Sequence, residues 1–235
     1  MTTKPAFNLA GLPGVGKTSL IEGLLSLLKT QGKNPAGFKP FDAGLIADNA
    51  LERRSDCERI AALMSFEPAL GLITPYTGHE DYPIELALRR DGTRVDWKFL
   101  NSRRKILLEH YDLCLSEMPG GLATPLTEQK SVIDWLKETG DPLIYLIRPE
   151  PSGLNQMLLE LELLNRSGLD YHLIFCNLER SLDGDWIFYQ WEKAEALAQR
   201  QAMGMLPFLK DPSPKALGQA IETHLPKLVE LCLGL

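Results

Sequence analysis

The stretch AFNLAGLPGVGKTSLIEGLLSLLK, residues 6–29, decides the fold of this chain. Its first five residues, Ala6–Ala10, form an apolar run that predicts a buried strand. A glycine-rich turn follows, and residues 19–29 then carry leucines at helical spacing. A strand, a glycine-rich turn and a helix in this order begin an α/β domain.

Residues 11–18 match the phosphate-loop pattern GxxxxGK[ST] at every specified position. Glycines let consecutive backbone N–H groups surround a phosphate, and the N-terminus of the next helix adds partial positive charge. The lysine of such a loop neutralises the β- and γ-phosphates, and its hydroxyl residue binds Mg²⁺. The predicted nucleotide-binding residues of this loop are Gly14, Val15, Gly16, Lys17, Thr18 and Ser19.

Short apolar runs alternate with amphipathic runs along the rest of the chain. Strands are predicted at 35–38, 112–115, 143–147 and 172–176, with a short element at 203–206. Helices are predicted at 56–64, 85–90, 97–109, 131–137, 155–164, 186–200 and 215–233. The alternation is typical of a mostly parallel sheet with helices on both faces, here as one P-loop NTPase-type domain over residues 1–235. The irregular segments 39–49 and 74–83 are interpreted as active-site loops.

The composition limits the possible functions. Of the 235 residues, 44% are hydrophobic and 24% charged, which excludes a disordered chain. A net charge of −6 argues against a nucleic-acid binder or a protein held at an anionic membrane surface. The four cysteines are scattered, and no stretch reaches the ~18 uncharged apolar residues of a membrane helix. We therefore expect a cytoplasmic protein without a nucleic-acid or membrane partner.

Several short motifs follow the phosphate loop: Gly37-Phe38-Lys39-Pro40 with Gly44, Ser55-Asp56, Thr74-Pro75-Tyr76, Ser116-Glu117-Met118-Pro119-Gly120-Gly121, Thr124-Pro125-Leu126, Ser152-Gly153-Leu154-Asn155, Cys176-Asn177 and Gly204-Met205-Leu206-Pro207. In this order, and over nearly the whole chain, they resemble the dethiobiotin synthetases of biotin biosynthesis. The resemblance implies a homodimeric enzyme that uses ATP and Mg²⁺. Enzymes of this family use CO₂ to carboxylate 7,8-diaminopelargonate, then phosphorylate the carbamate and close the ureido ring of dethiobiotin.

The resemblance also implies roles for single residues. A carbamate that attacks a γ-phosphate brings anions together, so cations must gather there, and Lys17 and Lys39 are the catalytic candidates. Thr18, Asp56 and Glu117 offer three oxygens for Mg²⁺. Alternatively, Lys39 is an ordinary loop lysine and Asp56 only charges the first turn of a helix.

The remaining implied roles concern the base and the substrate. Asn177 would read adenine, beside the backbone of Leu206 and Pro207. The start of a predicted helix at Ser152, Gly153 and Asn155 would hold the substrate carboxylate of the neighbouring subunit, although Asn155 is equally consistent with local packing. The implied substrate residues are Lys39, Ala43, Gly120, Ser152, Gly153 and Asn155.

The chain departs from the family where the diamine would bind. The family loop GTDTEVGKT is one residue longer, and Leu12-Pro13 here lacks its threonine and glutamate side chains. Ala43 stands where the family motif KPxxSG has serine, and Asp42 is a candidate to replace the lost contact. Loss of polar partners weakens selection of a polar substrate. Two other interpretations stay open: an ATP-dependent ligase or kinase acting on another small molecule, and a nucleotide-binding regulatory module.

Overall fold

The computed structural model describes residues 4–43, 55–66, 68–180 and 183–235. Its central sheet has six parallel strands in the order β2-β5-β1-β6-β7-β8. These strands are β1 (Ala6–Ala10), β2 (Pro35–Phe38), β5 (Leu113–Glu117), β6 (Leu143–Ile147), β7 (Tyr171–Cys176) and β8 (Met205–Leu206). The parallel sheet with its helices confirms the predicted fold class.

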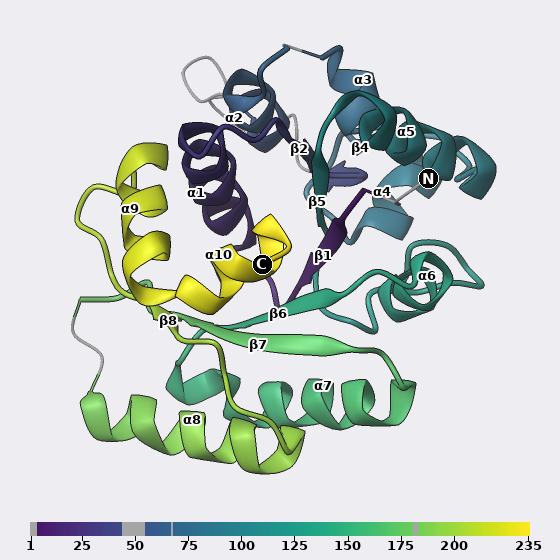
Figure 1. The fold of residues 1–235 in the computed structure, drawn as a ribbon. Helices are drawn as coiled ribbons and strands as arrows, with labels where there is room; N and C mark the ends of the chain where they lie inside the picture. The colour runs from purple at the N-terminus through teal and green to yellow at the C-terminus, as the bar shows by residue number, and fades with distance from the viewer. Residues whose placement is uncertain (1–3, 44–54, 67, 181–182) are drawn as a thin grey trace.

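Helices cover both faces of the sheet. They are α1 (Lys17–Thr30), α2 (Asp56–Leu63), α3 (Leu70–Ile73), α4 (Ile84–Arg90), α5 (Trp97–His110), α6 (Val132–Thr139), α7 (Leu154–Ser167), α8 (Gly184–Ala198), α9 (Pro214–His224) and α10 (Pro226–Leu233), with the 3₁₀ turn η1 at Pro151–Gly153. Helices α1 and α9 pack together on one side, and α7 and α8 lie side by side on the other (Figure 1). A sheet covered in this way needs strands that are apolar on both faces, which is why β6 reads LIYLI and is buried throughout.

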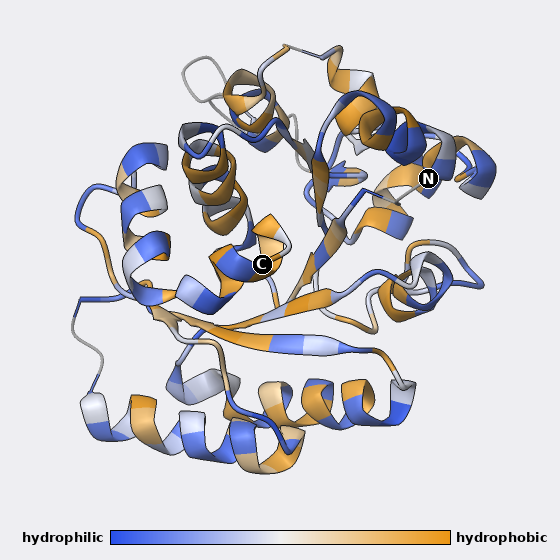
Figure 2. Cartoon of the chain, viewed as in Figure 1, coloured by the Kyte–Doolittle hydropathy of each residue, from blue (hydrophilic) through white to orange (hydrophobic). Residues whose placement is uncertain are grey.

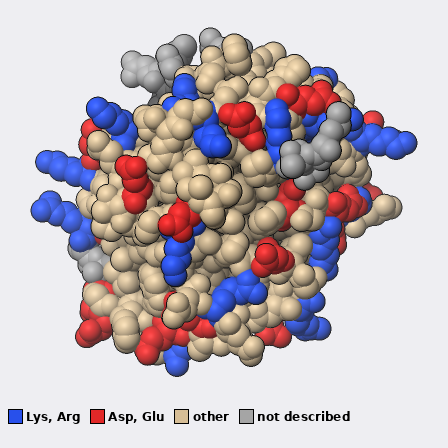
Figure 3. All heavy atoms as spheres, viewed as in Figure 1, with Lys and Arg blue, Asp and Glu red and all other residues tan. Residues whose placement is uncertain are grey.

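The hydropathy pattern follows these layers. In Figure 2 the strands are largely hydrophobic, and the covering helices alternate hydrophobic with hydrophilic residues. The face seen in Figure 3 carries acidic and basic side chains intermixed rather than a patch of one sign. All four cysteines are free and buried. Among the described residues, no helix is long and apolar enough to cross a membrane.

A second, two-stranded parallel sheet corrects the prediction that 39–49 and 74–83 are loops. It consists of β3 (Phe41–Ala43) and β4 (Tyr76–Gly78). The rings of Phe41 and Tyr76 stack with their centroids 5.6 Å apart. Strands of three residues are too short to show periodicity, so only their pairing across a long stretch of chain reveals them. Residue Gly44 of the sequence motif lies outside the described residues.

Most other predicted boundaries shift by a few residues, α3 was not predicted, and two changes alter the elements themselves. The single helix expected over 215–233 is divided into α9 and α10, because Pro226 has no N–H to continue the ladder of α9. The strand expected at 112–115 extends to Glu117, which pairs with Leu9 of β1. This extension places Glu117 beside the phosphate loop.

Candidate functional site

The phosphate loop connects β1 to α1 in the conformation that its glycines permit. Gly11, Gly14 and Gly16 have φ angles of 148°, 73° and 95°. A Cβ atom on Gly11 would lie 2.5 Å from the carbonyl oxygen of Leu146, so a larger residue cannot take this place. The buried Lys17 ammonium donates hydrogen bonds to the carbonyl oxygens of Gly11 (2.7 Å) and Leu12 (3.0 Å).

Four predicted site residues meet next to this loop. The Thr18 hydroxyl oxygen lies 3.2 Å from Asp56 Oδ2 and 3.0 Å from Glu117 Oε1, and its one hydrogen can be donated to either carboxylate. The Lys39 ammonium lies 2.6 Å from the same Asp56 oxygen and 3.0 Å from the same Glu117 oxygen. The structure therefore brings together the lysine and the three oxygen ligands that the sequence suggested.

The arrangement follows from how neighbouring elements end. Glu117 is the last residue of β5, and Lys39 follows directly after β2, the strand that pairs with β5. Asp56 is the first residue of α2, whose capping box is formed by Ser55 and Glu58. Carboxyl ends of adjacent parallel strands meet at one edge of a sheet, which is where open α/β sheets bind ligands.

The two lysines have opposite electrostatic environments. Burial lowers the pKa of Lys17 to about 8, although the carboxylates of Glu117 and Glu160 oppose this effect. Burial acts in the same direction on Lys39, but Glu117, Asp42 and Asp56 outweigh it and raise the pKa of Lys39 above its ordinary value. Lys39 is thus held firmly in its charged form.

The two aspartates that pair with Lys39 also differ. Burial tends to raise the pKa of Asp56, yet the ammonium of Lys39 outweighs this and leaves that pKa below the ordinary value. For Asp42, burial dominates and raises the pKa even though Lys39 opposes the shift. Asp42 is therefore the less well compensated carboxylate of the pair.

The oxygen cluster has the composition that Mg²⁺ requires. Thr18, Asp56 and Glu117 supply hard oxygens, and the buried Glu117 Oε2 has no hydrogen-bond partner among the described residues. Within the described part of the chain, no three His, Cys, Asp or Glu side chains converge as a metal site. A cluster of two carboxylates and a hydroxyl suits Mg²⁺, which keeps several waters and shares phosphate oxygens with its substrate.

A cavity of about 760 Å³ opens along the phosphate loop. It is lined by the following predicted site residues: Gly14, Gly16, Lys17, Thr18, Ser19, Lys39, Ala43, Asp56, Glu117 and Gly120. The Val15 side chain instead packs in the core. The cavity lining also contains Asp81 and Tyr82, which lie in the segment 74–83 that the sequence suggested as an active-site loop.

Other predicted residues lie away from this lining. Asn177 donates its backbone N–H to the carbonyl oxygen of Leu206 (2.8 Å), so the ends of β7 and β8 meet there, with Pro207 next in the chain. The neighbouring Leu178 does line the cavity. Asn177 Oδ1 accepts from the backbone N–H of Glu179 at 3.0 Å.

The predicted carboxylate corner is likewise separate. Ser152 and Gly153 belong to η1, and Asn155 lies in the first turn of α7. Ser152 and Asn155 are exposed, whereas Gly153 is buried. These three residues are outside the cavity lining.

Two arginines at the site were missed in the sequence. Arg59 pairs with Asp56 Oδ1 (3.0 Å) and with Glu22 Oε1 (2.6 Å), and it lines the cavity. Arg148 follows β6 and lies 3.9 Å from where a Cβ atom on Gly14 would be. A basic residue directly after a central strand was the available signal for Arg148.

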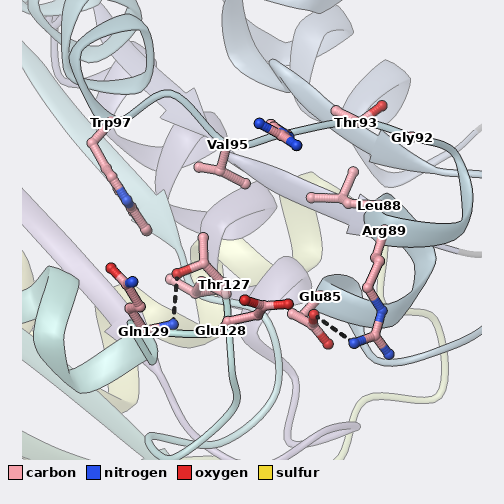
Figure 4. A pocket seen from close by; sticks show the side chains of 12 residues that line it. Glu85, Leu88, Arg89, Gly92, Thr93, Val95, Trp97, Thr127, Glu128 and Gln129 are labelled. Atoms are coloured by element: carbon pink, nitrogen blue, oxygen red, sulfur yellow. Dashed lines mark hydrogen bonds and ion pairs between the residues drawn. The ribbon is translucent and has the colours of Figure 1, made fainter.

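A second cavity, of about 610 Å³, lies between the α4–α5 connection and residues 126–129 (Figure 4). Glu85 and Arg89 form an ion pair of 3.5 Å at its rim, and Trp97 extends into the view from the other side. Among the described residues, none of its lining residues is shared with the phosphate-loop cavity or with the predicted site. The phosphate-loop cavity is therefore the candidate site.

Solved structures show the same fold at low sequence identity. A ParA family ATPase from Chlorobium tepidum TLS superimposes with a TM-score of 0.55 at 13% identity, over 99% of each chain. An ATP complex of a McdA variant from Cyanothece superimposes with a TM-score of 0.53 at 16% identity, over 100% of this chain and 98% of that chain. At such identities the likeness concerns the fold alone.

Curated relatives point to a narrower group. The ATP-dependent dethiobiotin synthetase of Bacillus cereus (strain G9842) is 28% identical over 196 residues, covering 83% of this chain and 80% of that protein. The enzyme of the same name from Bacillus thuringiensis (strain Al Hakam) is 28% identical over 202 residues, covering 83% and 80%. A family model described as an AAA domain, AAA_26, matches residues 12–216. The chain therefore belongs to this AAA domain family, the family of the dethiobiotin synthetases, as a divergent member.

Proposed function

We propose that this protein is an ATP- and Mg²⁺-dependent dethiobiotin synthetase, a cyclo-ligase acting on 7,8-diaminopelargonate and CO₂. The observation that carries the proposal is the meeting of Lys39 with Thr18, Asp56 and Glu117 beside the Lys17 loop. A protein that only bound a nucleotide would need fewer charges at the γ-phosphate. The identity to dethiobiotin synthetases supports the same reaction class.

The proposed reaction has three steps. An amine of the substrate adds to CO₂ and loses a proton, which gives a carbamate. A carbamate oxygen then attacks the γ-phosphorus of ATP and ADP leaves. Finally the second amine attacks the carbamate carbon and loses a proton, and inorganic phosphate leaves as the ureido ring closes. Each step gathers negative charge on oxygens, so preorganised cations stabilise its transition state.

The residues of the site would have separate roles in these steps. Lys17 and Lys39 would contact the transferring phosphoryl group from two sides, with Lys17 held by its loop carbonyls and Lys39 by carboxylates. Thr18, Asp56 and Glu117 would hold Mg²⁺, which supplies charge neutralisation at the phosphate oxygens. Gly14, Val15, Gly16 and Ser19 would donate backbone N–H groups to the phosphates.

The remaining roles belong to the same proposal. Asn177 would read adenine beside Leu206 and Pro207, while Ala43 and Gly120 would border the diamine. Ser152, Gly153 and Asn155 would receive the substrate carboxylate from the other subunit of a homodimer. We place the enzyme in the cytoplasm, with small-molecule partners only.

A turnover assay tests the reaction. Purified protein is incubated with ATP, Mg²⁺, bicarbonate and 7,8-diaminopelargonate, and ADP and dethiobiotin are followed by mass spectrometry. Equal formation of both is the expected result. ADP without dethiobiotin would support the second candidate, a ligase or kinase with another small substrate, which Pro13 and Ala43 in the cavity lining favour.

The Lys39→Ala variant separates an enzyme from a nucleotide-binding regulatory module. Because Lys39 is bound to carboxylates rather than to the loop, we expect turnover to collapse while ATP affinity stays similar. Turnover is measured by ADP release and affinity by calorimetry. Equal losses in both quantities would favour the regulatory module.

A further inference from the structure

We propose that Asp42 binds an ammonium group of the acceptor substrate and thereby selects amine-bearing molecules. The inference rests on the proposed function, because it concerns the acceptor end of the same cavity. Asp42 directly precedes Ala43, the position at which the cavity lining differs from the serine of the family motif KPxxSG.

The small sheet positions Asp42 at the cavity. All three residues of β3, Phe41, Asp42 and Ala43, line the cavity, and the strand is fixed there because the buried ring of Phe41 stacks on Tyr76 of β4. The Asp42 side chain is 13% exposed and lines the cavity. Its Oδ1 accepts a hydrogen bond from the backbone N–H of Ala43 (3.2 Å), so the carboxylate is held in place by its own strand.

Among the described residues, the charges around Asp42 do not balance. The Lys39 ammonium lies 2.6 Å from Asp56, 3.0 Å from Glu117 and 3.6 Å from Asp42, so one cation serves three carboxylates. Of the other cations that line the cavity in the described part of the chain, Arg59 is paired with Asp56 and with Glu22, and Lys17 donates to loop carbonyl oxygens. Of the three carboxylates, Asp42 has the longest ion pair.

Catalysis by the proposed reaction would leave Asp42 without a counter-charge. Mg²⁺ would neutralise Asp56 and Glu117, and Lys39 would turn toward the phosphoryl group. A largely buried carboxylate without an opposite charge is costly. A substrate ammonium in the cavity would supply that charge, whereas a neutral or anionic acceptor would not. One ammonium of a diamine can fill this role while its other, neutral amine adds to CO₂; the bound ammonium then transfers a proton to the Asp42 carboxylate, which frees its lone pair to attack in ring closure.

Binding measurements test the proposal independently of turnover. The protein is loaded with Mg²⁺ and a non-hydrolysable ATP analogue, and it is titrated by calorimetry with 7,8-diaminopelargonate and with nonanoate, its amine-free counterpart. Because a charge-assisted hydrogen bond is lost, Asp42→Asn should weaken diamine binding by about 10- to 100-fold. Binding of nonanoate and of the ATP analogue should stay as in the wild type, which a merely structural defect would not allow.

Two further variants serve as controls. Asp185→Asn makes the same change at an exposed position in the first turn of α8 and should leave diamine affinity unchanged. Asp42→Ser removes the charge with a smaller side chain. It should show the same loss of diamine affinity as Asp42→Asn, and it replaces that variant in the test if Asp42→Asn folds poorly.

The outcomes distinguish the two proposals. Unchanged diamine affinity in Asp42→Asn, or a wild type that does not prefer the diamine to nonanoate, would overturn the role of Asp42. Dethiobiotin formation by such a protein would still uphold the proposed reaction. Conversely, diamine binding that depends on Asp42, without dethiobiotin formation, would sustain the amine site and refute the reaction.

Discussion

Lys17 and Lys39 show how neighbouring groups shift the pKa of the same side chain in opposite directions. Lys17 is buried against the neutral carbonyl groups of Gly11 and Leu12, and its pKa falls to about 8. Lys39 is buried against carboxylates, and its pKa rises. Of these two lysines, therefore, only Lys17 changes its charge near neutral pH, because its pKa alone lies close to that range.

This difference predicts the pH dependence of ATP binding. Phosphates bind the charged lysine, so affinity should be full below pH 8 and should fall by about tenfold per pH unit as Lys17 loses its proton above that value. Calorimetric dissociation constants between pH 7 and pH 10 measure this slope. Lys17→Arg keeps its charge over the range and should show a flat profile, whatever its absolute affinity. A flat profile in the wild type would contradict the prediction.

At the scale of the elements, the packing of α2 on β2 sets the position of Asp56. A Cβ atom on Gly37 of β2 would lie 2.4 Å from Ile60 Cγ2 of α2. The absence of a side chain at Gly37 thus lets α2 approach the sheet, and its first residue, Asp56, reaches Thr18. The glycine of the sequence motif is therefore a spacing residue for the oxygen cluster.

Gly37→Ala should disturb both stability and metal-dependent binding. The methyl group overpacks the contact with Ile60, which typically costs about 1–3 kcal/mol of unfolding free energy. Displacement of α2 should also weaken the Mg²⁺ dependence of ATP binding. Urea denaturation and calorimetry measure the two effects. Gly71→Ala in α3, where no described atom lies within 4 Å of the added atom, is the matched control and should not destabilise the protein, because alanine favours a helix over glycine by up to about 1 kcal/mol.

At the scale of the whole molecule, the predicted carboxylate corner and the cavity occupy different places. Ser152 and Asn155 are exposed at the start of α7, outside the cavity lining. The cavity itself concentrates charge around Lys39. A homodimer that presents the corner of one subunit to the cavity of the other would complete the site, and a symmetric dimer would do so twice.

Mixing of two inactive variants tests this shared site. Lys39→Ala damages the phosphoryl end, and Ser152→Asp combined with Asn155→Asp repels the substrate carboxylate. Equal mixing with subunit exchange should restore about a quarter of wild-type turnover, because half of the dimers are mixed and each carries one intact site. Dethiobiotin formation measures the recovery. Mixtures that stay inactive although the subunits exchange would show that each site lies within one chain.

The local elements of this protein were predictable because their signals lie within short stretches of sequence. The phosphate loop is a contiguous motif between an apolar strand and an amphipathic helix, and β1, β2 and β6 have the predicted bounds. Burial on both faces of a parallel sheet requires apolar strands, which the composition of each run displays directly. The ordered motifs likewise identified the family before any contact was known.

The contacts that make the site depended on the tertiary structure. Thr18 meets Asp56 and Glu117 across 38 and 99 residues of sequence, and no periodicity encodes such distances. The sharing of Lys39 among three carboxylates, the small sheet that directs Asp42 into the cavity, and the approach of Arg59 all arise in the same way. They follow from the packing of strand ends and helix starts from separate parts of the chain, because burial and charge balance are properties of that assembly rather than of any one segment.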